Sequence, residues 1–281
     1  MLELPELEVI RERLRLALVG RRIAEARALD RAAFVTRNPP PAALDGAHFR
    51  NVTRRGRHLV FETDAGAAFA LRLGRYGRIA LRRPPTGIQR GTVFAVTLAD
   101  DTGLDVIDTG RRVRLEIALA GKAAELPWLG RAGLDPLDPS FTLTALRSTL
   151  ARVDTTLRLA LSDNQVIAGP LDAFADEIQF EARLSPFHST ALLRAEEAIR
   201  LHLAIKRTVS NAIVRYKSLP TDILPDESHR DFLRVYRRAD APCPACGSPV
   251  RTVREGHITT HYCPHCQTSG IELADRNAPA D

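Results

Sequence analysis

The chain has 281 residues, of which 44% are hydrophobic, so it is long enough to bury a sizeable core and to form two domains. It has no apolar run of membrane-spanning length, and Glu3, Glu6 and Glu8 interrupt the order of residues that a signal peptide needs, so we expect a soluble protein of a reducing, intracellular compartment. The formal net charge of +6 suits a polyanionic partner such as nucleic acid without demanding one.

The first predicted element is an amphipathic helix from Pro5 to Val19. Proline suits the first turn of a helix, and Gly20 supplies the stop signal. Apolar residues recur at intervals of three and four positions, at Leu7, Ile10, Leu14 and Leu18. One face of this helix is therefore expected to pack on a core.

From Ile23 to about Leu119 the pattern changes to short alternating segments separated by glycine and proline. Alternation with period two is typical of strands that bury one face. The clearest segments are 58–62, 67–72, 92–98 and 113–117. This part of the chain predicts an antiparallel sandwich or barrel.

A proline-rich break at 133–139 ends the strand region, and helical periodicity returns after it. The predicted helices cover 142–152, 155–161, 170–183 and 189–215. Residues 216–235 are rich in proline and acidic side chains and are predicted to form a loop. The fold class is therefore α+β and multidomain, with a helix and β-sandwich followed by a helical domain and a C-terminal hairpin.

All four cysteines lie near the C-terminus, in two pairs with the two-residue gap that zinc knuckles use. They are Cys243, Cys246, Cys263 and Cys266. The alternative, two disulfides, needs an oxidising compartment and a small cysteine-dense domain. Zinc is thus the predicted cofactor, and we expect the nearby His257, His261 and His265 to be surface residues rather than ligands.

The order of these elements and six short motifs resembles the formamidopyrimidine-DNA glycosylase/endonuclease VIII family of base-excision repair. The resemblance covers nearly the whole chain. The motifs are Leu2-Glu-Leu-Pro-Glu6, Arg54-Arg-Gly-Arg-His-Leu59, Leu73-Gly-Arg-Tyr-Gly77, Asp108-Thr-Gly-Arg-Arg112, Asp163-Asn-Gln-Val-Ile-Ala-Gly169, and Val235-Tyr-Arg-Arg238 with the finger. Any one motif is weak, but all six in the right order are specific.

The resemblance implies which residues act and how the chain divides. Glu3 would be the catalytic acid/base and Glu6 a supporting residue, while Leu2 stands at the position of the family nucleophile without being one. DNA contacts would come from Arg57, Arg75, Tyr76, Arg111, Arg112 and Asp172. The expected domains are a catalytic helix and β-sandwich at 1–136, a helix-two-turn-helix domain at 140–235, a zinc finger at 236–270 and a flexible tail at 271–281.

Three departures from the family pattern affect its chemistry. Leu2 replaces the proline whose secondary amine attacks the sugar, and lysine occurs at three positions only, Lys122, Lys206 and Lys217. Asp172 replaces the asparagine of a phosphate-binding turn, where we expect it to serve as a helix N-cap. Ile258 stands where the finger carries a phosphate-contacting arginine.

We therefore expect a DNA glycosylase that hydrolyses the N-glycosidic bond of a damaged, flipped base, with weak or absent abasic-site lyase activity. The alternative is a non-catalytic relative that binds or senses damaged DNA, and a smaller alternative is a zinc-finger protein acting on RNA or another protein. The expected partner is double-stranded DNA, with no membrane. The expected setting is a monomer in the bacterial cytoplasm, associated with the nucleoid.

Overall fold

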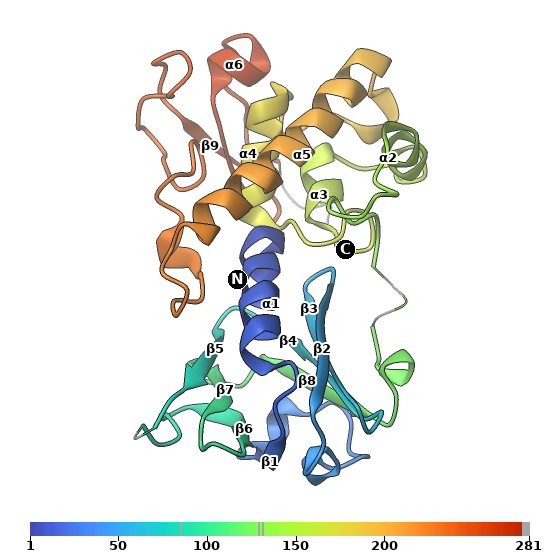
Figure 1. Ribbon diagram of the computed structural model, residues 1–281. Coiled ribbons are helices and arrows are strands. Elements are labelled where there is room, and N and C mark those ends of the chain that lie inside the picture. The colour runs from blue at the N-terminus through green and yellow to red at the C-terminus, as the bar shows by residue number, and fades with distance from the viewer. Residues whose placement is uncertain (85, 129, 131, 277–281) are drawn as a thin grey trace. The chain divides into compact units, whose positions relative to one another are not determined.

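The computed structural model describes residues 1–276, with the exception of 85, 129 and 131, and divides into two compact units (Figure 1). The first comprises Met1–Arg131 and Arg215–Ser228, and the second comprises Ala132–Val214 and His229–Asp281. No helix among the described residues is long and apolar enough to cross a membrane.

The first unit opens with helix α1, Leu4–Leu18, within one residue of the predicted limits. Its apolar stripe is fully buried in the main core of the unit, through Leu7, Ile10, Leu14 and Leu18. The helix packs against strand β2, Phe49–Arg55, and ends just before Gly20, which has a φ of +82°. Glycine reaches this left-handed conformation without a Cβ clash, so the chain can reverse there.

Eight antiparallel strands form two four-stranded sheets, as the alternating pattern predicts. One sheet has the order β2, β3 (His58–Thr63), β4 (Ala68–Arg72) and β8 (Glu116–Ala120). The other has the order β1 (Ile23–Ala28), β6 (Thr92–Leu98), β7 (Gly103–Asp108) and β5 (Gly77–Arg82). Aromatic rings fill the core, with Phe61 stacked on Phe69 and Phe94 edge-on to Phe69.

The predicted strand at 113–117 is wrong in its position, because the strand begins at Glu116. The backbone N–H groups of Arg114 and Leu115 donate to the carboxylate of Asp108, at 2.9 and 3.1 Å. A side chain therefore binds the donors that a strand ladder would use. Short 3-10 turns connect other parts of the unit, namely η1 (Arg31–Ala33), η2 (Pro41–Leu44) and η3 (Ala123–Glu125), and a further turn, η6 (Glu227–His229), lies where the chain passes from the first unit to the second.

The second unit contains helices α2 (Leu143–Leu150), α3 (Leu157–Ser162) and α4 (Asp172–Ala182), close to the predicted limits. Helix α5 (Ala195–Lys217) starts later than predicted, because Thr190–Leu192 forms a separate 3-10 turn, η5. Two caps explain the division. The hydroxyl of Ser189 accepts from the N–H of Ala191, and the carboxylate of Glu197 accepts from the N–H of Arg194.

The C-terminal hairpin comprises β9 (Arg251–Glu255), β10 (Ile258–Tyr262) and the short helix α6 (Pro264–Thr268). It packs on α4 through β10 and α6. The Gln267 amide links the hairpin to the segment that follows α4. Its Oε1 accepts from the N–H of Cys263 and its Nε2 donates to the carbonyl of Leu184, each at 2.9 Å. The hairpin and the helices of this unit thus share one buried interface.

Candidate active site and metal centre

The N-terminal turn of α1 buries the residues that the sequence predicts for catalysis. Leu2, Glu3 and Glu6 are 4%, 1% and 0% exposed. The backbone N–H of Glu3, the N-cap residue, donates to Glu6 Oε2 at 3.2 Å. Two carboxylates therefore lie at the N-terminus of a helix, where the orphan N–H groups and the dipole favour negative charge.

Glu6 also accepts a hydrogen bond from the Tyr216 hydroxyl, at 2.8 Å, near the end of α5. Tyr216 is 1% exposed. Sequence reasoning missed this residue because 216–235 was predicted to be a loop, whereas the helix continues through Lys217. Helical periodicity could have identified it, because Val209, Ala212 and Tyr216 follow one another at intervals of three and four residues and form one buried stripe.

The N-terminal amine of Met1 is ion-paired with the carboxylate of Glu227, on the turn η6. An amine held in this ion pair must leave the carboxylate before it can attack a sugar carbon. The contact therefore bears directly on whether an imine can form at the Met1 amine.

A cavity of about 450 Å³ opens beside this turn. Leu2, Leu7 and Leu73 form its apolar side. Its charged lining comes from Arg57, Arg72, Arg75, Arg114 and Glu116. The structure thus brings two of the predicted DNA-contact residues, Arg57 and Arg75, to the cavity that Leu2 lines, together with three charged residues that sequence reasoning missed.

The chain crosses between the two sheets twice beside this cavity, at 73–76 and at 109–115. The two crossings are locked together, because the N–H of Thr109 donates to the carbonyl of Tyr76 at 3.2 Å. Gly74 has a φ of +59°, and a Cβ on it would lie 2.9 Å from the carbonyl oxygen of Arg114. Only glycine permits this close approach.

The two crossings also carry four of the predicted DNA-contact residues. Arg111 and Arg112 are exposed on the second crossing. On the first crossing, the Arg75 guanidinium lies 5.8 Å from the centre of the Tyr76 ring.

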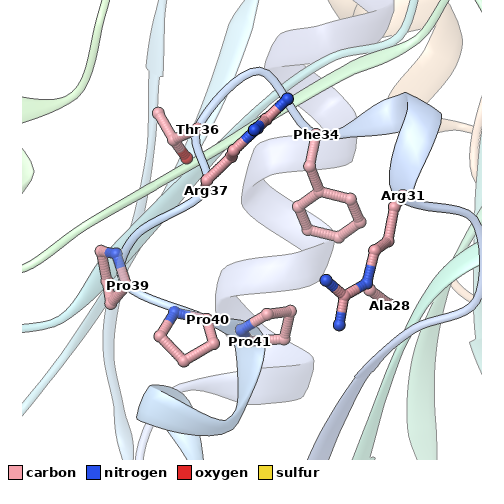
Figure 2. A pocket seen from close by; sticks show the side chains of 8 residues that line it. All are labelled: Ala28, Arg31, Phe34, Thr36, Arg37, Pro39, Pro40 and Pro41. Carbon is pink, nitrogen blue, oxygen red and sulfur yellow. The ribbon is translucent and has the colours of Figure 1, made fainter.

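A second cavity of about 380 Å³ lies elsewhere on the first unit. Figure 2 shows Phe34 and Arg31 along one side of it and three consecutive prolines, 39 to 41, along the other. None of the residues predicted to act in catalysis or DNA binding is among those drawn there. The cavity beside Leu2 is therefore the candidate active site.

Asp172 lies in the second unit, and the interpretation of it as a helix N-cap is wrong. Leu171 is the N-cap, and Asp172 is the first residue of α4. Its carboxylate accepts from Nη2 of Arg158 at 3.0 Å, and Nε of the same guanidinium donates to Asp176 at 2.9 Å. The charge of Asp172 is thus partly balanced by Arg158, a neighbour from α3 that is 1% exposed.

Asp176 continues this network into the hairpin. Its second oxygen accepts from the backbone N–H of His261 and contacts the ring Nδ1, each at 2.9 Å. The expectation that His261 is a surface residue is therefore wrong, because its side chain is only 12% exposed. His257 and His265 are exposed, as expected.

The Arg158→Ala variant is expected to lose about 3–5 kcal/mol of the free energy of unfolding, because it leaves the Asp176 carboxylate, which is 0% exposed, without its guanidinium partner. Denaturant titration of the full chain measures the change. The control is Arg207→Ala, which removes an exposed arginine 4.0 Å from Glu181 and should cost less than about 1 kcal/mol. Equal losses for both variants would show that the buried network does not stabilise the unit.

The four cysteines converge as a metal site requires. Their sulfur atoms lie within 4.8 Å of one another, with 3.5 Å between Cys246 and Cys263 and 4.0 Å between Cys243 and Cys266. A tetrahedral zinc ion with Zn–S bonds of about 2.3 Å needs sulfur separations of about 3.8 Å. All four are free thiols rather than disulfides. The donor set and its spacing therefore fit a structural zinc ion.

Three of the thiols have shifted pKa values. Hydrogen bonds with Ser248 lower the pKa of Cys246 to about 6, whereas burial raises the pKa of Cys263 and, with the neighbouring thiols, that of Cys266. Zinc binds thiolates and must displace the protons of the latter two. Acid should therefore weaken zinc binding.

Sequence profiles of three known domains match the chain in order. The formamidopyrimidine-DNA glycosylase N-terminal domain matches residues 1–115, and the H2TH domain of the same enzyme matches 132–222. The zinc finger found in FPG and IleRS matches 241–268. The three matches together cover most of the chain.

Curated relatives and solved structures agree with these profiles. The formamidopyrimidine-DNA glycosylase of Thermus thermophilus is 35% identical over 280 residues, which cover 96% of this chain and all of the relative. The enzyme of the same name from Symbiobacterium thermophilum is 33% identical, covering 99% of this chain and 93% of its own length.

Among solved structures, the crystal structure of the Thermus thermophilus MutM (FPG) protein superposes with a TM-score of 0.81, at 32% identity, over 95% of this chain and 98% of that one. The Lactococcus lactis enzyme, solved with DNA that contains an abasic site, shares the fold, with a TM-score of 0.83 at 23% identity over 94% of this chain and 99% of that one. On these profiles, relatives and structures, the chain belongs to the formamidopyrimidine-DNA glycosylase family of base-excision-repair enzymes.

Proposed function

We propose that this chain hydrolyses the N-glycosidic bond of a damaged base flipped out of duplex DNA, with Glu3 as the general acid/base. The observation that carries the proposal is the N-terminal turn, where Glu3 is almost fully buried directly after Leu2, a residue of the cavity wall. A general acid at this position would protonate the sugar or activate water as the bond to the base breaks.

The surrounding residues receive supporting roles in this proposal. Glu6 fixes the N-terminal turn through its bonds to the Glu3 N–H and the Tyr216 hydroxyl. Arg57, Arg75, Tyr76, Arg111 and Arg112 bind the DNA around the flipped nucleotide, since arginine suits phosphate and base edges alike. We further propose that the protein acts as a monomer in the bacterial cytoplasm, at the nucleoid.

A panel of duplexes with one damaged base each tests the proposal directly. Base release is scored by chromatography before any chemical cleavage of the strand, with undamaged duplex and RNA as the comparison. Release from at least one damaged base supports the glycosylase. Tight binding of damaged duplex without release from any of them supports the second candidate, a non-catalytic damage sensor.

Two substitutions favour that second candidate. The α4 turn, which in the family presents an asparagine to phosphate, carries Asp172, and Arg158 balances only part of the negative charge because it is shared with Asp176. Ile258 adds no charge on the hairpin. A chain that has changed two contacts of the DNA backbone could have changed its chemistry too.

Borohydride is expected to trap little covalent adduct between the wild-type protein and abasic DNA. Elimination needs an imine, which only an amine can form. The nitrogen of Leu2 is an amide in the peptide bond to Met1, and the amine of Met1 is ion-paired with Glu227. The trapped fraction on a denaturing gel measures this. Leu2→Pro, once methionine is removed, should raise the trapped fraction because it restores a secondary amine at the turn. Strong trapping by the wild type would contradict the expectation, and mass spectrometry of the adduct would identify the reacting amine.

A further inference from the structure

An arginine and a carboxylate form a fixed polar edge in the wall of the candidate active site. Arg72, the last residue of β4, lies opposite Glu116, the first residue of β8, in antiparallel register. Nε of Arg72 donates to Glu116 Oε2 at 2.9 Å, and Nη2 donates to Oε1 at 2.5 Å. Two parallel hydrogen bonds hold both planar groups in one orientation.

This pair keeps hydrogen-bonding capacity for a ligand. A guanidinium has more N–H donors, and a carboxylate more lone pairs, than the two bonds between them use. The side chains of Arg72 and Glu116 are 49% and 30% exposed, and both line the cavity. A donor and an acceptor are therefore presented next to each other.

The apolar part of the cavity lining suits a flat ring. Leu2, Leu7 and Leu73 supply an apolar side, and the volume of about 450 Å³ lies within the range of about 300–1,000 Å³ that is usual for ligand sites. The residues that precede Glu116 are anchored by Asp108, and Leu73 precedes Gly74, which packs against the backbone of Arg114. Hydrogen bonds and close backbone packing thus hold the segments next to Glu116 and Leu73 in place.

We propose that Arg72 and Glu116 read the edge of the flipped base, with Glu116 accepting a hydrogen bond from a ring N–H and Arg72 donating to the adjacent carbonyl oxygen. This inference rests on the proposed function, because a flipped base must enter the cavity. The substrates it selects are bases with an imide or lactam edge, in which a ring N–H stands beside a carbonyl. A methyl group on that nitrogen removes the donor and collides with Glu116.

The test compares duplexes that contain 5,6-dihydrouracil with duplexes that contain its N3-methyl derivative. Equilibrium binding and single-turnover base release are measured for the wild type and for Glu116→Ala. We expect the wild type to prefer the N–H base by a factor of about 10 or more, because a site that bonds a ring N–H rejects the analogue without it. In Glu116→Ala the ratio should fall to about 3 or less, since the acceptor is gone.

The matched control is Glu62→Ala. Glu62 also pairs with an arginine across neighbouring strands of the same sheet, with Arg50 Nη2 at 3.1 Å, but it is outside the cavity lining. This control should keep the wild-type preference for the N–H base over its N3-methyl derivative. Its melting temperature shows how much stability the loss of such a cross-strand ion pair costs by itself.

Failure of this inference is separable from failure of the proposed function. The inference is overturned if the wild type binds and releases the N–H base and its N3-methyl derivative equally well. It is also overturned if Glu116→Ala keeps the wild-type preference for the N–H base. Preferential release of 3-methyladenine, which lacks such an edge, overturns it too. If no base is released but the affinities differ as expected, the base-reading role stands and the glycosylase proposal falls.

Discussion

The Glu3→Gln variant is expected to lose base release by a factor of about 10²–10⁴ while its affinity for damaged duplex stays within a few-fold of the wild type. Glutamine has the size of glutamate but cannot exchange a proton at the reacting sugar. Because Glu3 is only 1% exposed, a same-sized side chain should keep the packing of the turn. Single-turnover kinetics and equilibrium binding on one lesion duplex measure the two effects separately.

Two further variants show whether the loss is specific. Glu12→Gln makes the same chemical change on the same helix, at a half-buried residue that pairs with Lys217, and should keep full activity. Glu6→Gln can still accept from the Tyr216 hydroxyl and should fall between the two. Full activity of Glu3→Gln would assign the proton transfer to another group.

Loss of zinc should have the second large effect. The Cys246→Ser variant is expected to lose its metal, unfold the hairpin at 241–268 and bind DNA less tightly. A structural zinc site supplies about 10–16 kcal/mol of apparent binding free energy, and this is also folding free energy of the hairpin. Elemental analysis should find one zinc per wild-type chain and less than one in the variant, and circular dichroism should show the loss of structure.

The hairpin also offers a matched control and a pH test. His265→Ala removes an exposed residue between two zinc ligands and should retain the metal. Because protons compete with zinc for the thiols of Cys263 and Cys266, whose pKa values are raised, a chelator should remove zinc faster as the pH falls. A wild-type chain without zinc would contradict the prediction outright.

Much of the fold follows from local patterns. Helix α1 and most strands were predicted because the periods of 3.6 and two residues directly reflect which side chains face the core. The zinc site was predicted because each cysteine pair closes a local knuckle whose geometry depends only on its spacing. The order of motifs sufficed for the family, although it left the catalytic roles of Glu3 and Leu2 as predictions.

Errors arose where a side-chain contact from outside the segment overrides the local pattern. Residues 113–115 alternate like a strand, but the carboxylate of Asp108 accepts from the N–H groups of Arg114 and Leu115, and β8 begins only at Glu116. Asp172 has the local character of a cap, but Arg158 from α3 pairs with its carboxylate. Local propensity cannot include a partner whose position is set by packing.

By itself the sequence determined the helix and strand periods, the zinc ligands and the family. Only the tertiary structure decided that Tyr216 meets Glu6 across 210 residues, that His261 meets Asp176 across 85, and that Arg72 and Glu116 share a cavity wall with Leu2. The physical reason is common to all three. A buried polar contact depends on which backbones the hydrophobic core brings together, and this is a property of the whole packed unit rather than of any short segment.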